Sequence, residues 1–136
     1  MEIMRKYYTI SEAEDVIPLL KPRIVNLIKL SKAIEFLESV DIQYADEYET
    51  IKQDIMMNKK FHDYSLKFCR EVERMLNEGV ILKDIEEGLV NFFALHEGKE
   101  IFLCWKLGEH NIDSWYEVNS EYEFRKPISE LKRKKV

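Results

Sequence analysis

The sequence contains few glycines and few cysteines. Its four glycines, at positions 79, 88, 98 and 108, never cluster, which argues against the glycine-rich phosphate loops of nucleotide hydrolases and dinucleotide-binding proteins. Its two cysteines, Cys69 and Cys104, are far apart and match neither a disulfide framework nor a zinc motif. We therefore expect no cofactor and no metal.

Long uncharged apolar runs and an excess of basic residues are also missing. No stretch is apolar for the ~18 residues that a membrane span requires, and residues 1–8 lack the apolar run of a signal peptide. The net charge is −5, whereas general nucleic-acid binding needs a positive surface. We expect a cytoplasmic protein that binds neither membranes nor nucleic acid.

The residues that are present suit one globular domain over 1–136. Hydrophobic residues make up 46% of the chain, an ordinary value for a chain that buries its own core. Residues 10–78 have a helical pattern, residues 80–118 read as a β-meander, and residues 126–136 form a basic tail. Such a tail is either a solvated end or a contact arm for an acidic partner.

The first half of the sequence predicts two long helices. Thr9 and Glu12 have the spacing of a capping box, which satisfies backbone N–H groups at a helix start. Apolar residues then recur at helical spacing through residues 13–37. Pro18 and Pro22 interrupt this run, and each removes a backbone donor. We predict either a bend at this point or a short helix followed by a longer one from Pro18.

The second helix is predicted from Tyr44 to Glu78, after a short connection. We predict that its apolar stripe packs on the first helix in an antiparallel hairpin. Asn58 and His62 lie on the same seam, where they predict a polar pair that fixes register or a ligand site between the helices. The stripe comprises Tyr48, Ile51, Ile55, Cys69, Val72 and Leu76, and is widened by Phe61, Phe68 and Met75.

After Gly79, which is a natural helix stop, short apolar runs alternate with turn residues, as in β-strands. The segment His96–Lys99 reads as a hairpin loop in which Gly98 is free to take a positive φ. The predicted strands are Val80–Asp84, Gly88–Leu95, Glu100–Leu107 and Asp113–Val118.

These elements predict an α+β fold, in which a long antiparallel helical hairpin packs on a small antiparallel sheet of three to four strands. The central strands are apolar on both faces, since Leu89 and Phe93 alternate with Val90 and Phe92. The helices would cover one face. The other face would be covered by a second copy of the chain, giving a homodimer, or by residues 115–128.

Five segments together resemble a known family. The resemblance is to domain-of-unknown-function family 2203, a group of small prokaryotic proteins without an assigned activity. It covers nearly the whole chain and implies a bacterial or archaeal protein of one domain, without supplying a function. The segments are Tyr8–Ala13, Val80–Asp84, Gly88–Phe92, Phe102–Glu109 and Trp115–Glu117, of which Phe102–Glu109 is the most specific.

The chain departs from the family pattern at two positions. Members commonly carry Asp where Asn91 stands and His where Tyr116 stands. If a family metal or acid–base site uses that pair, this chain has lost both ligands. In that case the two departures argue against a metal here.

The best candidate site for a small polar ligand lies on the sheet half. Strand alternation places Cys104 and Lys106 on one face, and a meander brings Asp84 and Asn91 beside it. Carboxylates, an amide, cations and an aromatic wall suit such a ligand. The alternative is that the carboxylates cap turns, the lysine is solvated and the tryptophan belongs to the core. The candidates are Asp84, Asn91, Cys104, Lys106, Glu109, Trp115, Glu117 and Arg125.

No residue set pairs a reactive group with its activator. Cys104 as a nucleophile would need a neighbouring base and a lowered pKa, and its place between Leu103 and Trp105 is typical of a small buried hydrophobe. We name no catalytic residue. Two functions remain open: a non-catalytic interaction module that self-associates and binds a protein partner or a small polar ligand, or a small-molecule enzyme or sensor with a polar site on the sheet half.

Overall fold

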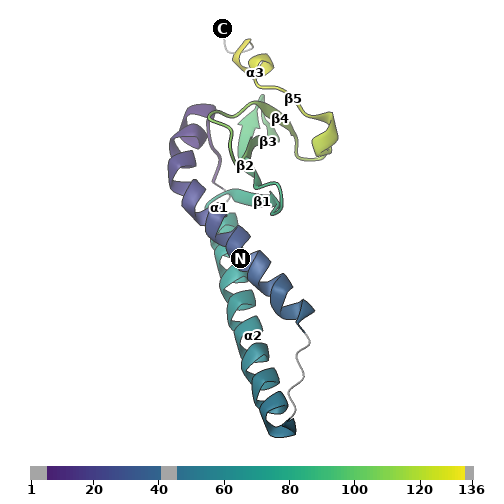
Figure 1. Ribbon diagram of the computed structural model, residues 1–136. Helices are drawn as coiled ribbons and strands as arrows, with labels where there is room; N and C mark the ends of the chain where they lie inside the picture. The colour runs from purple at the N-terminus through teal and green to yellow at the C-terminus, as the bar shows by residue number, and fades with distance from the viewer. Residues whose placement is uncertain (1–5, 41–45, 134–136) are drawn as a thin grey trace.

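The computed structural model describes residues 6–40 and 46–133, and it confirms an α+β chain with a helical hairpin (Figure 1). The sheet has five strands in the order β1-β2-β3-β4-β5, more than the three to four predicted. The elements are α1 Ile10–Ser39, α2 Glu47–Asn77, β1 Val80–Asp84, β2 Leu89–His96, β3 Lys99–Lys106, β4 Ser114–Glu117, the 3-10 helix η1 Tyr122–Phe124, β5 Lys126–Pro127 and α3 Ser129–Arg133.

The start of α1 has the predicted capping box. The Glu12 N–H donates to Thr9 Oγ1 and the Thr9 N–H donates to Glu12 Oε1, both at 3.1 Å. The helix continues through Pro18 and Pro22, and its axis changes direction along its length (Figure 1). Both prolines are exposed, and on the solvent side of a helix a bend is tolerated because carbonyls that tilt outward are hydrated. The bend is therefore observed, and the break into two helices is not.

Helix α2 begins after Asp46, whose side chain accepts a hydrogen bond from the Tyr48 N–H at 3.1 Å. The predicted start at Tyr44 and the connection before it lie outside the described residues. The helix ends before Gly79, which has a φ of 86°. A Cβ at Gly79 would lie 2.5 Å from the Lys6 carbonyl oxygen, so a side chain is excluded there as well as strained.

The sheet is an antiparallel meander whose central hairpin has the predicted loop. His96 pairs with Lys99, and the two residues between them, Glu97 and Gly98, have φ values of 52° and 79°. Positive φ at both central residues matches the right-handed twist of the flanking strands. The extra strand β5 comprises only two residues, one of them Pro127, and such a short strand has no periodicity to read.

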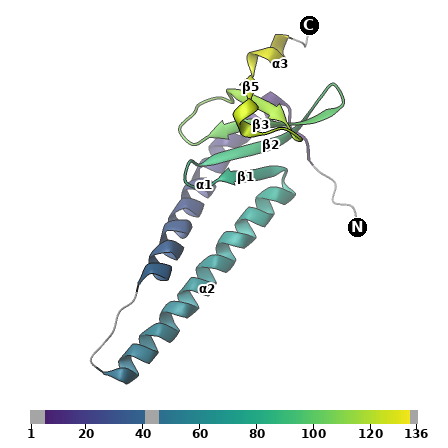
Figure 2. The ribbon, with the colours of Figure 1, turned by 90° about the vertical axis from the view of Figure 1, so that its right-hand side faces the viewer.

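One face of the sheet packs on α1, and this layer forms the core. Figure 2 shows the sheet lying across the upper ends of the two helices. The buried residues come from α1, the end of α2 and alternate positions of the strands, so the helices cover one sheet face as predicted. They include Ala13, Ile17, Leu20, Ile24, Leu27, Met75, Val80, Val90, Phe92, Ala94, Ile101, Leu103, Trp105 and Trp115.

The predicted basic tail is structured over residues 126–133. Lys126 pairs with Trp115 in the sheet, and Leu131 of α3 is only 3% exposed and belongs to the core. The pairing of β5 with β4, the partly buried Ile128 and Leu131 together hold this segment, although charged residues dominate its sequence. Residues 134–136 lie outside the described residues.

The prediction of which α2 residues pack on α1 was largely wrong. The α2 residues that pack toward α1 and the core are Phe68, Val72 and Met75, and Phe61 shares a hollow with Leu37 and Glu38 at the end of α1. Most of the predicted heptad residues face solvent. The reason is that α2 carries two apolar faces side by side, and α1 covers the phenylalanine-rich face that runs into the core at Met75.

Candidate functional site

The sheet face that points away from the helices carries most of the predicted site. Register places Asn91, Cys104 and Ser114 in one row across β2, β3 and β4. The neighbouring row consists of Phe93, Phe102 and Tyr116. We call this surface the second sheet face. Side chains alternate between faces along a strand, so polar and aromatic rows stand side by side on it.

Asn91 and Tyr116, the two positions at which the chain departs from the resembled pattern, contact each other. Asn91 Nδ2 donates to Tyr116 Oη at 2.7 Å. Asn91 is 1% exposed, and its Oδ1 accepts no hydrogen bond from any described residue. Burial raises the pKa of the Tyr116 phenol, so the pair is neutral at physiological pH and carries no charge for acid–base chemistry.

Cys104 lies beside this pair and is 2% exposed. Burial raises the pKa of its thiol to about 12, although the hydrogen bond with Ser114 and the charge of Arg125 act in the opposite direction. The thiolate is the nucleophilic form, and at neutral pH it is almost absent. The environment of Cys104 is therefore that of a buried apolar residue.

The segment after β4 closes part of the second sheet face within the same chain. The Tyr122 ring of η1 packs edge-on against Tyr116, with ring centroids 6.1 Å apart. The Arg125 guanidinium lies 4.3 Å from the centre of the Tyr122 ring, a cation–π contact. Of the two covers considered for this face, the structure has the one from residues 115–128 over part of it.

A hollow of about 310 Å³ opens at the end of this face. Two of its charges are paired, because Lys106 Nζ lies 2.5 Å from Glu87 Oε2. Asp84 holds the turn after β1, where its Oδ1 accepts from the Glu86 and Glu87 N–H groups at 3.0 and 3.2 Å. The lining residues are Lys83, Asp84, Glu87, Leu89, Lys106 and Tyr122.

Glu109 holds the turn after β3. Its Oε1 accepts from the Lys106 N–H, and its backbone carbonyl accepts from Trp105 Nε1, both at 2.8 Å. Burial raises the pKa of its carboxyl group and the nearby Asp113 raises it further, against the hydrogen bond from Lys106. The shift has a local cause in the turn, and Glu109 does not line the hollow.

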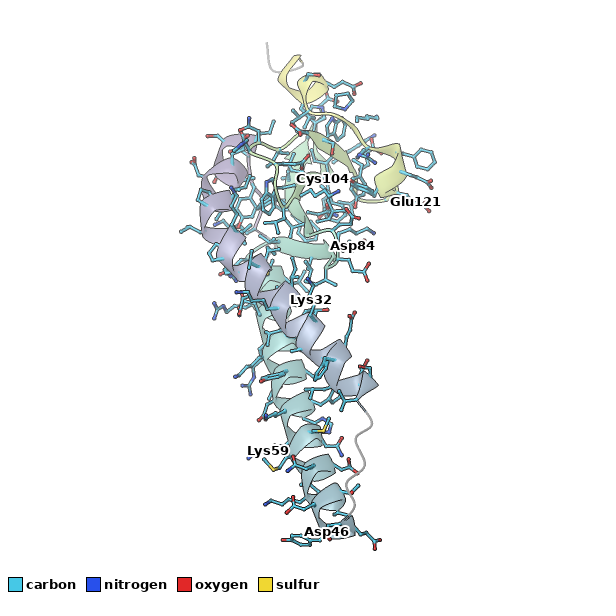
Figure 3. All side chains as sticks on the ribbon, in the orientation of Figure 1. Lys32, Asp46, Lys59, Asp84, Cys104 and Glu121 are labelled. Atoms are coloured by element: carbon cyan, nitrogen blue, oxygen red, sulfur yellow. The ribbon has the colours of Figure 1, made fainter. Side chains whose placement is uncertain are left out.

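The structure divides the predicted site between two faces. Trp115 and Glu117 pair with Leu103 and Ile101, so they stand on the face that the helices cover. Trp115 is 4% exposed, and its Nε1 donates to the Pro127 carbonyl at 3.2 Å. Asn91, Cys104, Lys106 and Arg125 belong to the second sheet face or its cover, with Asp84 at the edge of the hollow. Figure 3 shows Asp84 and Cys104 together in the sheet half.

A second surface lies on α2 and consists largely of residues that the sequence predicts to face α1. We call it the α2 stripe. Its apolar side chains are exposed, four of them by half or more: Tyr48 70%, Ile51 52%, Ile55 63% and Leu76 50%. Asn58 and His62 are exposed between its two apolar ends, near Lys59, which Figure 3 places midway along the helix. The stripe comprises Tyr48, Ile51, Ile55, Leu66, Cys69 and Leu76.

Neither surface has the donors of a metal site. Among the described residues, no three His, Cys, Asp or Glu side chains are grouped so that they would hold a metal ion. In the same part of the chain, no helix combines the length and apolar character that crossing a membrane requires.

Comparison with known families matches residues 6–128 to the uncharacterised conserved protein family DUF2203. This match spans most of the chain, which therefore belongs to that family. It confirms the resemblance found in the sequence. No curated protein and no solved structure matches the chain.

Proposed function

We propose that this member of the DUF2203 family is a non-catalytic interaction module that forms a homodimer through the α2 stripe. One observation carries the proposal: a 31-residue helix has a regular row of apolar side chains that α1 does not cover. In a monomer, these side chains would remain in water. Contiguous exposed apolar surface of this kind is typical of protein interfaces.

Several features favour a second copy of the chain as the partner. The stripe has two apolar ends and a polar centre at Asn58 and His62, so it can meet its own copy with apolar on apolar and polar on polar surface. It also has an exposed cation and an exposed anion on one flank, Lys52 and Glu73, which complement each other between copies. A symmetric contact of one patch with itself is the commonest route to a dimer.

The enzyme alternative has less support. A reaction on the second sheet face would need a group that is charged or nucleophilic at neutral pH, and the three polar residues at its centre are a neutral thiol, an amide and a phenol. A small polar ligand in the hollow near Lys106 remains a second candidate, supported by its size of about 310 Å³. Two free thiols support a reducing, cytoplasmic setting in a bacterial or archaeal cell.

Two neighbouring substitutions test the proposal. Ile55 belongs to the stripe, whereas Met56 is 46% exposed and lies about 100° around the helix, outside the stripe. Ile55→Lys places a charge in the interface and should weaken dimerisation about tenfold or more, while Met56→Lys should leave it unchanged. Light scattering after size exclusion measures the mass, and a thermal melt checks that both variants fold.

The expected mass is twice 16.4 kDa for the wild type and Met56→Lys at about 50 μM, a concentration that populates dimers of micromolar Kd, and the average mass of Ile55→Lys should be clearly lower at the same concentration. A dimer that tolerates Ile55→Lys would use another surface. A wild-type monomer at this concentration would overturn the proposal.

A further inference from the structure

We infer that the two copies pair through antiparallel α2 helices, in a register whose two-fold axis passes between Asp63 and Tyr64; this inference rests on the proposed self-association. The stripe follows a heptad spacing with two sets of positions. The first set is 48, 55, 62, 69 and 76, and the second is 51, 58, 65 and 72. When one helix is reversed about this axis, positions 55, 62, 69 and 76 of the first set each face one position of the second set on the partner, and position 48 comes beside the end of the partner's helix.

The width of the sheet half decides between the two directions. Paired helices lie about 8–10 Å apart. Figure 2 shows the sheet half extending on either side of the upper end of α2, and in Figure 1 it extends well to one side. Parallel α2 helices would bring two sheet halves to the same end of the pair, where they would collide. Antiparallel helices place them at opposite ends, about 40 Å apart at 1.5 Å per residue.

Matching of side chains selects the register. With the axis between residues 63 and 64, Ile51 faces the partner's Leu76, an apolar contact between exposed side chains that occurs twice. Ile55 comes beside the partner's Val72, which packs partly on its own core and can offer only its remaining exposed surface. At the centre, His62 faces the partner's Ser65. The polar side chains of the stripe therefore meet polar or sulfur-bearing ones, and no apolar end meets the polar centre.

Charge on the flank agrees with this register. Lys52 comes to the level of the partner's Glu73, an opposite-charge pair that is formed twice. Lys59 comes beside the partner's Leu66, where its methylene chain can cover apolar surface. Moving the axis to residue 60 would instead bring the two copies of Lys59 together and would face Ile55 with Ser65. In that register the two copies of Lys59 repel each other, whereas in the inferred register Lys52 and Glu73 attract each other.

The native Cys69 provides a direct test. In the inferred register it faces the partner's Asn58, so an Asn58→Cys variant should form a disulfide between position 58 of one chain and Cys69 of the other. Within one chain the two positions are 11 residues apart on a helix, about 16 Å, too far for a disulfide. Asn58 is exposed, and Cys104 is buried, so folding and the second thiol do not interfere.

The experiment oxidises purified Asn58→Cys with diamide and identifies linked peptides by mass spectrometry. We expect covalent dimer linked 58-to-69, at least about tenfold above the Asn58→Cys, Cys69→Ser control, because only correctly placed thiols close a disulfide. Wild-type protein should give little covalent dimer. An Ile51→Cys variant tests the alternative register with the axis at residue 60. In that register position 51 faces the partner's Cys69.

The outcomes separate the register from the dimer itself. A 69-to-69 link in the wild type would show parallel helices and overturn the inference. A 51-to-69 link without a 58-to-69 link would overturn the register. Light scattering on the same samples reports the mass independently of any link. A dimer by mass without the 58-to-69 link contradicts only this inference, whereas a monomer by mass contradicts the proposed function.

Discussion

The two halves of the molecule differ in how completely they bury their apolar side chains. The sheet half buries most of its apolar side chains within one chain: α1 covers one face, and the segment around Tyr122 closes over part of the other. The helical half buries one apolar face of α2 and leaves the other in water. A domain can therefore be complete in one region and incomplete in another, and the incomplete region is the better guide to a partner.

The largest predicted effect contrasts the same residue type in the two halves. Phe92 is fully buried in the sheet, whereas Phe36 of α1 is 65% exposed. Phe92→Ala should lower the free energy of unfolding by about 3–5 kcal/mol, because it removes core contacts and leaves a cavity. Phe36→Ala should change it by less than about 0.5 kcal/mol. Urea denaturation measures both, and equal effects would contradict the contrast.

The next prediction concerns the Cys104 thiol and alkaline pH. The folded chain holds its pKa at about 12, against an ordinary value of 9.0. As the pH rises above 9, the unfolded chain loses this proton while the folded chain keeps it, so folding becomes less favourable. Wild-type protein should lose about 2 kcal/mol more than Cys104→Ala between about pH 8 and about pH 10.5. If the free energies of unfolding of the two proteins fell in parallel as the pH rises, the Cys104 thiol would be in contact with solvent in the folded chain.

These two predictions concern parts of the fold that the sequence revealed well. The capping box at Thr9, the strand Val80–Asp84 and the loop at Gly98 were all predicted, because each depends on residues close together in the chain. The face of α2 that meets α1 was not. Two apolar faces on one helix satisfy the same periodicity, and only the position of the core decides which of them is buried.

The candidate site shows the same limit. Strand alternation placed Cys104 and Lys106 on one face, and the register confirms it. Trp115 and Glu117 were grouped with them although they stand on the other face, because pairing of β4 with β3 cannot be read from either strand alone. The strand at Lys126 was missed because two residues carry no pattern.

The smallest predicted effect sharpens the description of the second sheet face. Tyr116→Phe removes the acceptor for Asn91 Nδ2 and leaves the whole buried amide without partners. It should lower the free energy of unfolding by about 1–2 kcal/mol. Adding Asn91→Leu removes the unpartnered amide, so the double variant should recover most of that loss. A double variant less stable than Tyr116→Phe would show that the amide has a further partner.

Sedimentation equilibrium of the wild-type protein from about 1 to about 100 μM, the range over which a dimer with a micromolar Kd forms, tests the central claim most directly. The α2 stripe predicts a mass that rises to twice the 16.4 kDa of one chain. A mass that stays at one chain throughout would contradict the claim that a second copy covers the stripe.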